Sequence, residues 1–260
     1  MEHRELSMVL TFDHIRDVKI CQSRKGYRFS VDALLLYSFV TMPLAERIAD
    51  LGAGSGIIGL LLAKKYPSAS VTLFELQQRL ASVAEKNVAL NNLGKRVRVM
   101  QGDVRDMSAI TSPPADAGSF DMVVSNPPFR KERSGLVNPE EERAVARHEI
   151  KLTLPELVRA AHYLLRTKGR FFLVHHPGRL AELVSVLREK RMEVKRLRFV
   201  HSRASSEAKM VLVEALHGGR GGVKVERPLV IFDEKGEYTE EMLVLYGVPS
   251  KERPRREQCS

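Results

Sequence analysis

The sequence predicts an α/β protein with a largely parallel sheet, and three observations support that fold class. A glycine-rich turn joins a short apolar strand at 47–51 to a helix that begins at Ile57. Two more strands, at 70–74 and 97–101, follow with a helical segment between them, and a fourth apolar run lies at 122–124. Strands that alternate with helices are typical of parallel sheets, because parallel strands need crossover connections.

The other elements follow from apolar periodicity and from cap residues. Ser30 is a suitable N-cap for a buried helix, and Thr153 is one for a strongly amphipathic helix. In chain order we expect a hairpin or a loose strand at 8–21, helices at 31–40 and 79–93, an irregular connection at 104–118, a helix after Thr153, strands at 171–174, 194–200 and 210–215 with a helix at 179–189, a short strand at 228–232 and a final helical turn at 240–246.

Polar residues follow three of the predicted strands, and a glycine follows a fourth. Intervals of 23, 28 and 23 residues separate Gly52, Glu75, Asp103 and Asn126. Each interval suits one strand-plus-helix repeat, so these residues can share the carboxyl edge of the sheet, where open α/β folds bind ligands. A carboxylate after the second strand can accept from both ribose hydroxyls, and one after the third can accept from an adenine amino group. A single acidic strand end is more often a helix cap.

The turn at 52–56 places glycines at 52, 54 and 56, which gives G-x-G-x-G. The dinucleotide-binding pattern G-x-G-x-x-G is absent because position 57 is Ile. A glycine-rich turn lets a ligand approach the backbone closely and directs helix N–H groups at an anion. Such a turn is a weak signal by itself, and its spacing to the polar strand ends strengthens it.

The tetrapeptide Asn126-Pro127-Pro128-Phe129 follows the apolar run at 122–124. Two prolines remove N–H donors, so nearby carbonyls stay free to accept. An amide oxygen and a free carbonyl can hold both hydrogens of a planar NH₂ group, and an aromatic ring can stack on a flat target. The tetrapeptide therefore fits an exocyclic or amide nitrogen. The alternative is a strand that ends in a Pro-Pro turn, with the Phe returning to the core.

Composition favours one catalytic domain with a polyanionic partner. The 260 residues are 43% hydrophobic, and the formal net charge is +10. Such a charge favours nucleic acid, although many basic surfaces bind nothing. Cys21 and Cys259 lie far apart, which gives no disulfide framework, and neither cysteines nor histidines show the spacing of metal ligands. Without a long apolar run or a signal peptide, we expect a cytoplasmic protein with no metal.

The segment at 130–151 is rich in both Lys/Arg and Glu. Asn138-Pro139 followed by three glutamates is a good helix start. Long polar insertions are usually functional or disordered, so we interpret this segment as mobile and substrate-facing, with a short helix at its end. A solvated charged helix is the alternative.

These motifs together resemble the class I S-adenosylmethionine-dependent methyltransferases. Within them the chain is similar to the family that methylates the amine of adenine 37 in tRNA(Val). The resemblance rests on Asp50-x-Gly52-x-Gly54-x-Gly56, Glu75, Asp103, the tetrapeptide at 126–129, Gly26–Ala33 and Glu237–Thr239. Enzymes that methylate guanine amines in ribosomal RNA, or a glutamine amide in release factors, use similar tetrapeptides.

The resemblance implies a fold, a set of domains and site residues. The implied fold is a seven-stranded Rossmann-like methyltransferase sheet in the order 3-2-1-4-5-7-6, with the last strand antiparallel and helices on both faces. The implied regions are an extension at 1–45 that packs on the core, the methyltransferase domain at 46–247, and a disordered basic tail at 248–260. The implied S-adenosylmethionine-binding residues are Asp50, Gly52, Ala53, Gly54, Gly56, Ile57, Glu75, Leu76, Asp103, Val104 and Asn126. Substrate-binding residues would be Arg28, Phe29, Arg130, Lys131 and Arg147.

The implied chemistry is methylation of a poorly nucleophilic amine. Asn126 and the Pro127 carbonyl would accept its two hydrogens, and Phe129, next to Pro128, would stack on the base. Three hypotheses stay open: an adenine-amine methyltransferase acting on tRNA, a methyltransferase for a guanine amine or a glutamine amide, and a non-catalytic RNA-binding scaffold. Phe129 mildly disfavours glutamine as the target, because the enzymes that modify glutamine tend to have Tyr there.

Overall fold

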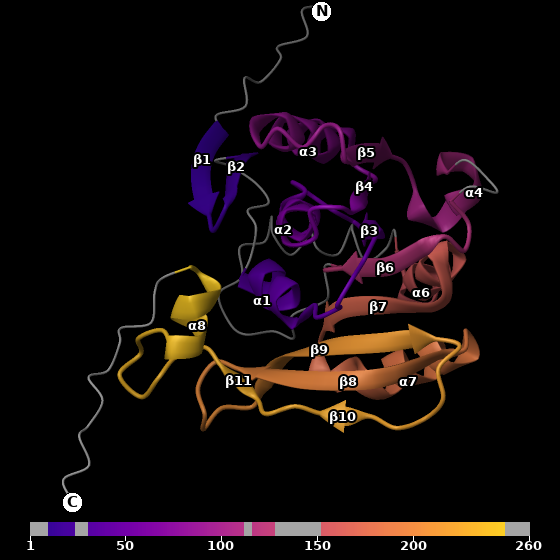
Figure 1. Ribbon diagram of the computed structural model, residues 1–260. Helices are drawn as coiled ribbons and strands as arrows, with labels where there is room; N and C mark the ends of the chain where they lie inside the picture. The colour runs from indigo at the N-terminus through magenta and orange to yellow at the C-terminus, as the bar shows by residue number, and fades with distance from the viewer. Residues whose placement is uncertain (1–9, 24–30, 112–115, 128–151, 248–260) are drawn as a thin grey trace, which may run out of the picture.

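The computed structural model describes residues 10–23, 31–111, 116–127 and 152–247. Within them, a mixed central sheet of nine strands is flanked by helices on both faces (Figure 1). The strands are β3 (Arg47–Leu51), β4 (Ser70–Glu75), β5 (Val97–Gln101), β6 (Phe120–Ser125), β7 (Leu165–His175), β8 (Met192–His201), β9 (Ala208–His217), β10 (Lys224–Val225) and β11 (Leu229–Val230).

The strands lie in the order β5-β4-β3-β6-β7-β9-β8-β10, and β11 also pairs with β8. Strand β9 runs antiparallel to both of its neighbours, and the other pairs are parallel. The expected count of seven strands is wrong, because β10 and β11 extend the sheet beyond β8. Pro228 stands between these two short strands and has no N–H to donate, so it interrupts the ladder at this edge.

Two apolar layers cover the sheet. One face carries α1 (Val31–Phe39), α2 (Ile57–Lys65) and α3 (Gln78–Leu90), and the other carries α6 (Leu154–Leu164) and α7 (Leu180–Glu189). Because side chains alternate along a strand, Met122 and Val124 of β6 join the first layer while Val123 joins the second. The side chains of Met122 and Val124 therefore point to the face of the sheet that carries α1 and α2.

The connection after β5 is more regular than expected. Its described part contains the 3₁₀ turn η1 (Val104–Asp106) and a short helix, α4 (Met107–Ile110). The expectation of an irregular segment over 104–118 is wrong here because two aspartates cap these turns. Asp103 accepts from the backbone N–H of Arg105, and Asp106 accepts from that of Ala109.

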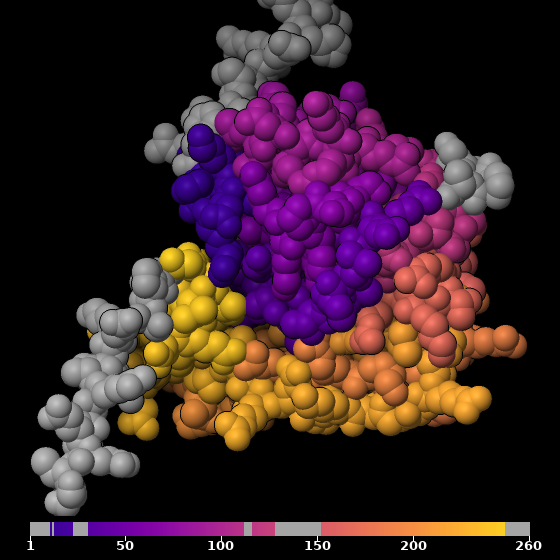
Figure 2. Space-filling view, viewed as in Figure 1, coloured from indigo at the N-terminus to yellow at the C-terminus, as the bar shows by residue number. Residues whose placement is uncertain are grey.

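The residues at 10–23 form a hairpin, which decides between the two expected alternatives. Its strands are β1 (Leu10–Ile15) and β2 (Val18–Ser23), paired antiparallel. At the turn, Arg16 donates to the carbonyls of Val244 and Leu245, which lie at the end of α8 (Glu240–Leu245). The hairpin and α8 therefore lie side by side, as the indigo and yellow surfaces in Figure 2 show.

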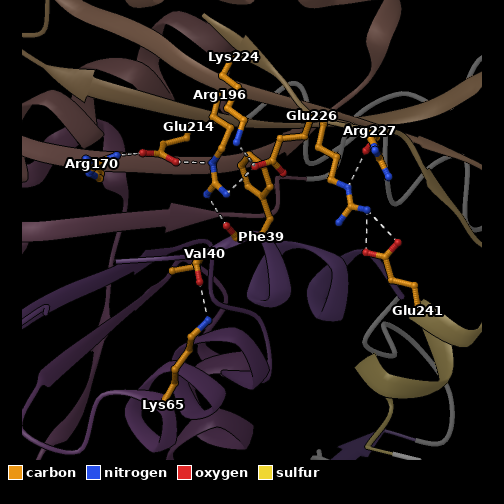
Figure 3. Close-up of polar contacts among 11 residues, drawn as sticks. Phe39, Val40, Lys65, Arg170, Arg196, Glu214, Lys224, Glu226, Arg227 and Glu241 are labelled. Atoms are coloured by element: carbon orange, nitrogen blue, oxygen red, sulfur yellow. Dashed lines mark hydrogen bonds and ion pairs between the residues drawn. The ribbon is translucent and has the colours of Figure 1, made fainter. Parts of the chain in front are cut away.

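An ion-pair network around a buried carboxylate joins the late strands to α1 (Figure 3). Glu214 of β9 is 3% exposed and pairs with Arg170 of β7 and with Arg196 of β8. Arg196 also donates to the Phe39 carbonyl at 2.6 Å and pairs with Glu226 at 3.2 Å. Its guanidinium lies 4.1 Å from the centroid of the Phe39 ring. One carboxylate thus links three strands to the end of α1.

Candidate functional site

The carboxyl ends of the central strands meet at one edge of the sheet. Leu51 of β3 is in register with Phe74 of β4 and with Ser125 of β6, and Glu75 is in register with Gln101. The next residues along each strand are the polar and glycine positions predicted from their spacing. The structure therefore brings Gly52, Glu75, Asn126 and the Gly102-Asp103 pair to this edge.

The glycine turn is held against β4. The amides of Gly52 and Ala53 both donate to the Phe74 carbonyl, at 2.9 and 3.0 Å. Gly52, Gly54 and Gly56 have φ values of 72°, 58° and 85°. A Cβ at Gly56 would lie 2.9 Å from Leu73 Cδ1, whereas a Cβ at Gly52 would meet no atom within 4 Å. The turn thus needs glycine for its backbone, and it leaves open space above Gly52.

Glu75 fixes the turn from the end of β4. The residue is 5% exposed; Oε2 accepts from the Gly54 amide at 2.9 Å and Oε1 accepts from the Gln77 amide at 2.8 Å. Each oxygen has a second lone pair, so the carboxylate can still accept from a ligand. Leu76, the next residue, is half-buried.

Asp50 lies beneath the same turn. It is 1% exposed, and Oδ2 accepts from the Gly59 amide at 3.0 Å. Burial raises the pKa of this carboxyl to about 7; the Gly59 hydrogen bond opposes this effect and the charge of Glu75 adds to it. Within the described residues, Asp50 Oδ1 and Ser55 Oγ are the buried side-chain atoms that have no hydrogen-bond partner. Asp50 lies near the end of β3, and Ser55 lies in the glycine turn that follows it.

Asp103 is more exposed than these carboxylates. Both of its oxygens accept from the Arg105 guanidinium, with an Nη2–Oδ2 distance of 2.5 Å, and its side chain is 31% exposed. Val104, which lies between Asp103 and Arg105 in the sequence, is buried in the apolar layer against α6. The sequence analysis did not identify Arg105, although the Asp-x-Arg spacing makes such a pair possible.

Asn126 and Pro127 are half-buried directly after β6. The preceding residue ties this strand end to the turn, because Ser125 Oγ donates to the Leu51 carbonyl at 2.8 Å. Ala53 and Ile57 are buried within the turn and at the start of α2. The remaining predicted site residues lie outside the described residues: Pro128, Phe129, Arg28, Phe29, Arg130, Lys131 and Arg147.

The described part of the chain contains no group of three or more His, Cys, Asp or Glu residues that could hold a metal ion. None of its helices is long and apolar enough to cross a membrane. The described polar groups at this edge are backbone amides, the carboxyls of Asp50, Glu75 and Asp103, and the Asn126 amide.

Comparisons with known proteins agree on one family. The model of the methyltransferase small domain matches residues 29–198. A tRNA1(Val) (adenine(37)-N6)-methyltransferase from Porphyromonas gingivalis is 34% identical over 199 residues, which cover 75% of this chain and 76% of that protein. A protein with the same name from Shewanella sp. (strain W3-18-1) is 29% identical over 92% of this chain and 97% of its own length.

Solved structures with the same fold include a predicted methyltransferase and a protein bound to AdoMet. A predicted O-methyltransferase from Agrobacterium tumefaciens superposes with a TM-score of 0.65 at 24% identity, covering 86% of this chain and 99% of that one. TYW2 from M. jannaschii in complex with AdoMet gives a TM-score of 0.55 at 14% identity, covering 80% and 86%. The chain belongs to the methyltransferase small domain family, and it is an S-adenosylmethionine-dependent methyltransferase.

Proposed function

We propose that this protein transfers a methyl group from S-adenosylmethionine to the exocyclic amine of a nucleic-acid base, with adenine in tRNA as the target. The observation that carries the proposal is the single sheet edge at which the glycine turn, Glu75 and Asn126 meet. The names of the relatives from Porphyromonas gingivalis and Shewanella support adenine in tRNA as the target. The net charge of +10 supports a polyanionic substrate.

The residues at this edge fit the methyl donor. Open space lies above Gly52, where a Cβ would meet no protein atom. Glu75 keeps acceptor capacity for ribose hydroxyls, and Asp50 Oδ1 and Ser55 Oγ are buried without partners. The proposed donor-binding residues are those implied by the resemblance: Asp50, Gly52, Ala53, Gly54, Gly56, Ile57, Glu75, Leu76, Asp103, Val104 and Asn126.

The protein supplies orientation, and the bound donor supplies the activated methyl group. The Asn126 side-chain oxygen and the Pro127 carbonyl would accept the two hydrogens of the target amine. This arrangement would direct the nitrogen lone pair away from both acceptors, so that it is available for transfer. Because the amine nitrogen becomes positively charged and acidic on accepting the methyl group, it can release a proton to water, and no strong general base is required beside it. We assign stacking on the base to Phe129, adjacent to Pro128.

The substrate side of the proposal concerns residues that the structure does not describe. We assign contacts with the RNA to Arg28, Phe29, Arg130 and Lys131, and a phosphate contact to Arg147. We further propose that residues 46–247 form the catalytic domain, with 1–45 as an extension of it and 248–260 as a basic tail.

The test is methyl transfer from labelled S-adenosylmethionine to unmodified bulk tRNA, ribosomal RNA and release factor in parallel. After digestion, we expect N6-methyladenosine from the tRNA pool. Label in guanosine or glutamine would assign the enzyme to another amine-bearing substrate. No label in any pool, with the donor bound, would contradict the proposal and favour the scaffold hypothesis.

A further inference from the structure

Two asparagines, Asn87 within α3 and Asn91 at its C-cap, hold the outer edge of strand β2. Asn91 Oδ1 accepts from the Lys19 amide at 2.9 Å, and its Nδ2 donates to the Lys19 carbonyl at 2.7 Å. One helical turn earlier, Asn87 repeats this pattern with Cys21, at 2.7 and 3.0 Å. Both residues of β2 therefore have their backbone groups paired by side-chain amides, which take the place of a neighbouring strand. Figure 1 shows the hairpin beside α3.

Asn87 makes one further contact that Asn91 lacks. Its Nδ2 donates to the Ser55 carbonyl at 2.9 Å, and the side chain is fully buried. The second hydrogen bond that Asn91 Nδ2 donates goes instead to the Asn87 carbonyl, at 2.8 Å. The two asparagines thus hold the hairpin in the same way, and only Asn87 also reaches the glycine turn.

The glycine turn is consequently fixed from two sides. Glu75 accepts from the Gly54 amide, and Asn87 donates to the carbonyl of the next residue, Ser55. The Gly56 amide donates to the Ala53 carbonyl at 2.8 Å. Three hydrogen bonds therefore set the orientation of the 53–54 and 55–56 peptide groups in a turn whose glycines all have positive φ. A turn that is ordered before its ligand arrives loses less entropy on binding.

We infer that Asn87 is a positioning residue for the methyl donor, and that it couples the β1–β2 hairpin to the donor-binding turn. The inference rests on the proposed function only in assigning that turn to S-adenosylmethionine. Asn87 touches the turn and not the reacting atoms, so its loss should weaken donor binding. It also follows that binding of the donor should slow hydrogen exchange at the Cys21 amide, whose acceptor is Asn87 Oδ1.

The first test compares Asn87→Ala with Asn91→Ala by calorimetric titration with S-adenosylmethionine. Both variants lose the same pair of bonds to the hairpin, so the midpoint of thermal unfolding should fall in both. We expect about tenfold weaker donor binding in Asn87→Ala, because a buried hydrogen bond to the turn is lost. Asn91→Ala should bind within about twofold of wild type. Equal donor affinity in the two variants would overturn the inference.

A second pair of variants of equal volume and an exchange measurement on wild type complete the test, and the exchange measurement does not depend on a variant that folds. Asn87→Asp and Asn91→Asp keep the side-chain volume and the acceptor for the hairpin amide, and both lose the NH₂ donor. The same difference in donor affinity is expected between them. In wild type, exchange at Cys21 should slow by at least threefold when the donor is present, and an unchanged rate would contradict the coupling. Wild type that does not bind S-adenosylmethionine would instead contradict the assignment of the turn.

Discussion

At the scale of single residues, sequence reasoning located strand ends well and missed their partners. Glu75 was expected at the ligand edge because a strand precedes it, and the structure places it there. Asn87 was not identified, since Asn inside a helix reads as a weak helix former and its partner Cys21 lies 66 residues away. The pairing of Arg105 with Asp103 was missed because spacing alone does not decide a rotamer.

The buried carboxyl of Asp50 predicts a pH-dependent stability. Its pKa in the folded protein, about 7, lies above the 3.8 of an ordinary Asp. Folding therefore favours the protonated form, and the stability from this group is full below about pH 4 and lost as the pH rises through about 7. Between these values Asp50→Asn should gain up to about 4 kcal/mol relative to wild type, at about 1.4 kcal/mol per pKa unit.

Urea unfolding of wild type and Asp50→Asn without cofactor, from about pH 4.5 to pH 8, would measure this difference. The unfolding free energy of Asp50→Asn minus that of wild type should increase with pH until about pH 7 and then level off. A gap that stays constant over this range would show that Asp50 is ionised in the folded protein throughout.

At the scale of elements, the long periodic segments were predicted, and one short strand was missed. The amphipathic helix after Thr153 was expected, and α6 begins at Leu154 with the Glu156 carboxylate accepting from the Thr153 amide. Strand β10 was missed because its two residues follow a glycine-rich, basic stretch with no apolar alternation. It forms by pairing with β8, which is a tertiary contact that local sequence does not encode.

The network around Glu214 predicts a stability effect that is separate from the site. Removing this buried carboxylate leaves Arg170 and Arg196 without their shared partner, so Glu214→Ala should lower the free energy of unfolding by about 3 kcal/mol. Glu182→Ala is the matched control, because its pair with Arg179 is solvent-exposed and should contribute no more than about 1 kcal/mol.

Denaturant unfolding of both variants checks this prediction, and titration with S-adenosylmethionine should give unchanged affinity in each. A loss at Glu214 no larger than that at Glu182 would mean that the network does not hold the late strands to α1.

At the scale of the whole molecule, the sheet collects parts that are distant in sequence. The glycine turn and Asn126 are at least 70 residues apart, yet β3 and β6 are neighbours in register. The sequence analysis could infer this edge because parallel α/β sheets align the carboxyl ends of their strands. It could not link the β1–β2 hairpin to the turn, since that link depends on one side chain of α3, Asn87.

The most direct test of the account is to compare wild type with Asn126→Ala in two assays, methyl transfer to unmodified tRNA and binding of S-adenosylmethionine. The account assigns the amine to Asn126 and holds the donor mainly on the glycine turn and Glu75. It therefore predicts a fall in turnover of at least about a hundredfold, as for loss of a group that orients the reacting atoms, with donor affinity within about threefold. Turnover that is retained in Asn126→Ala would contradict the account.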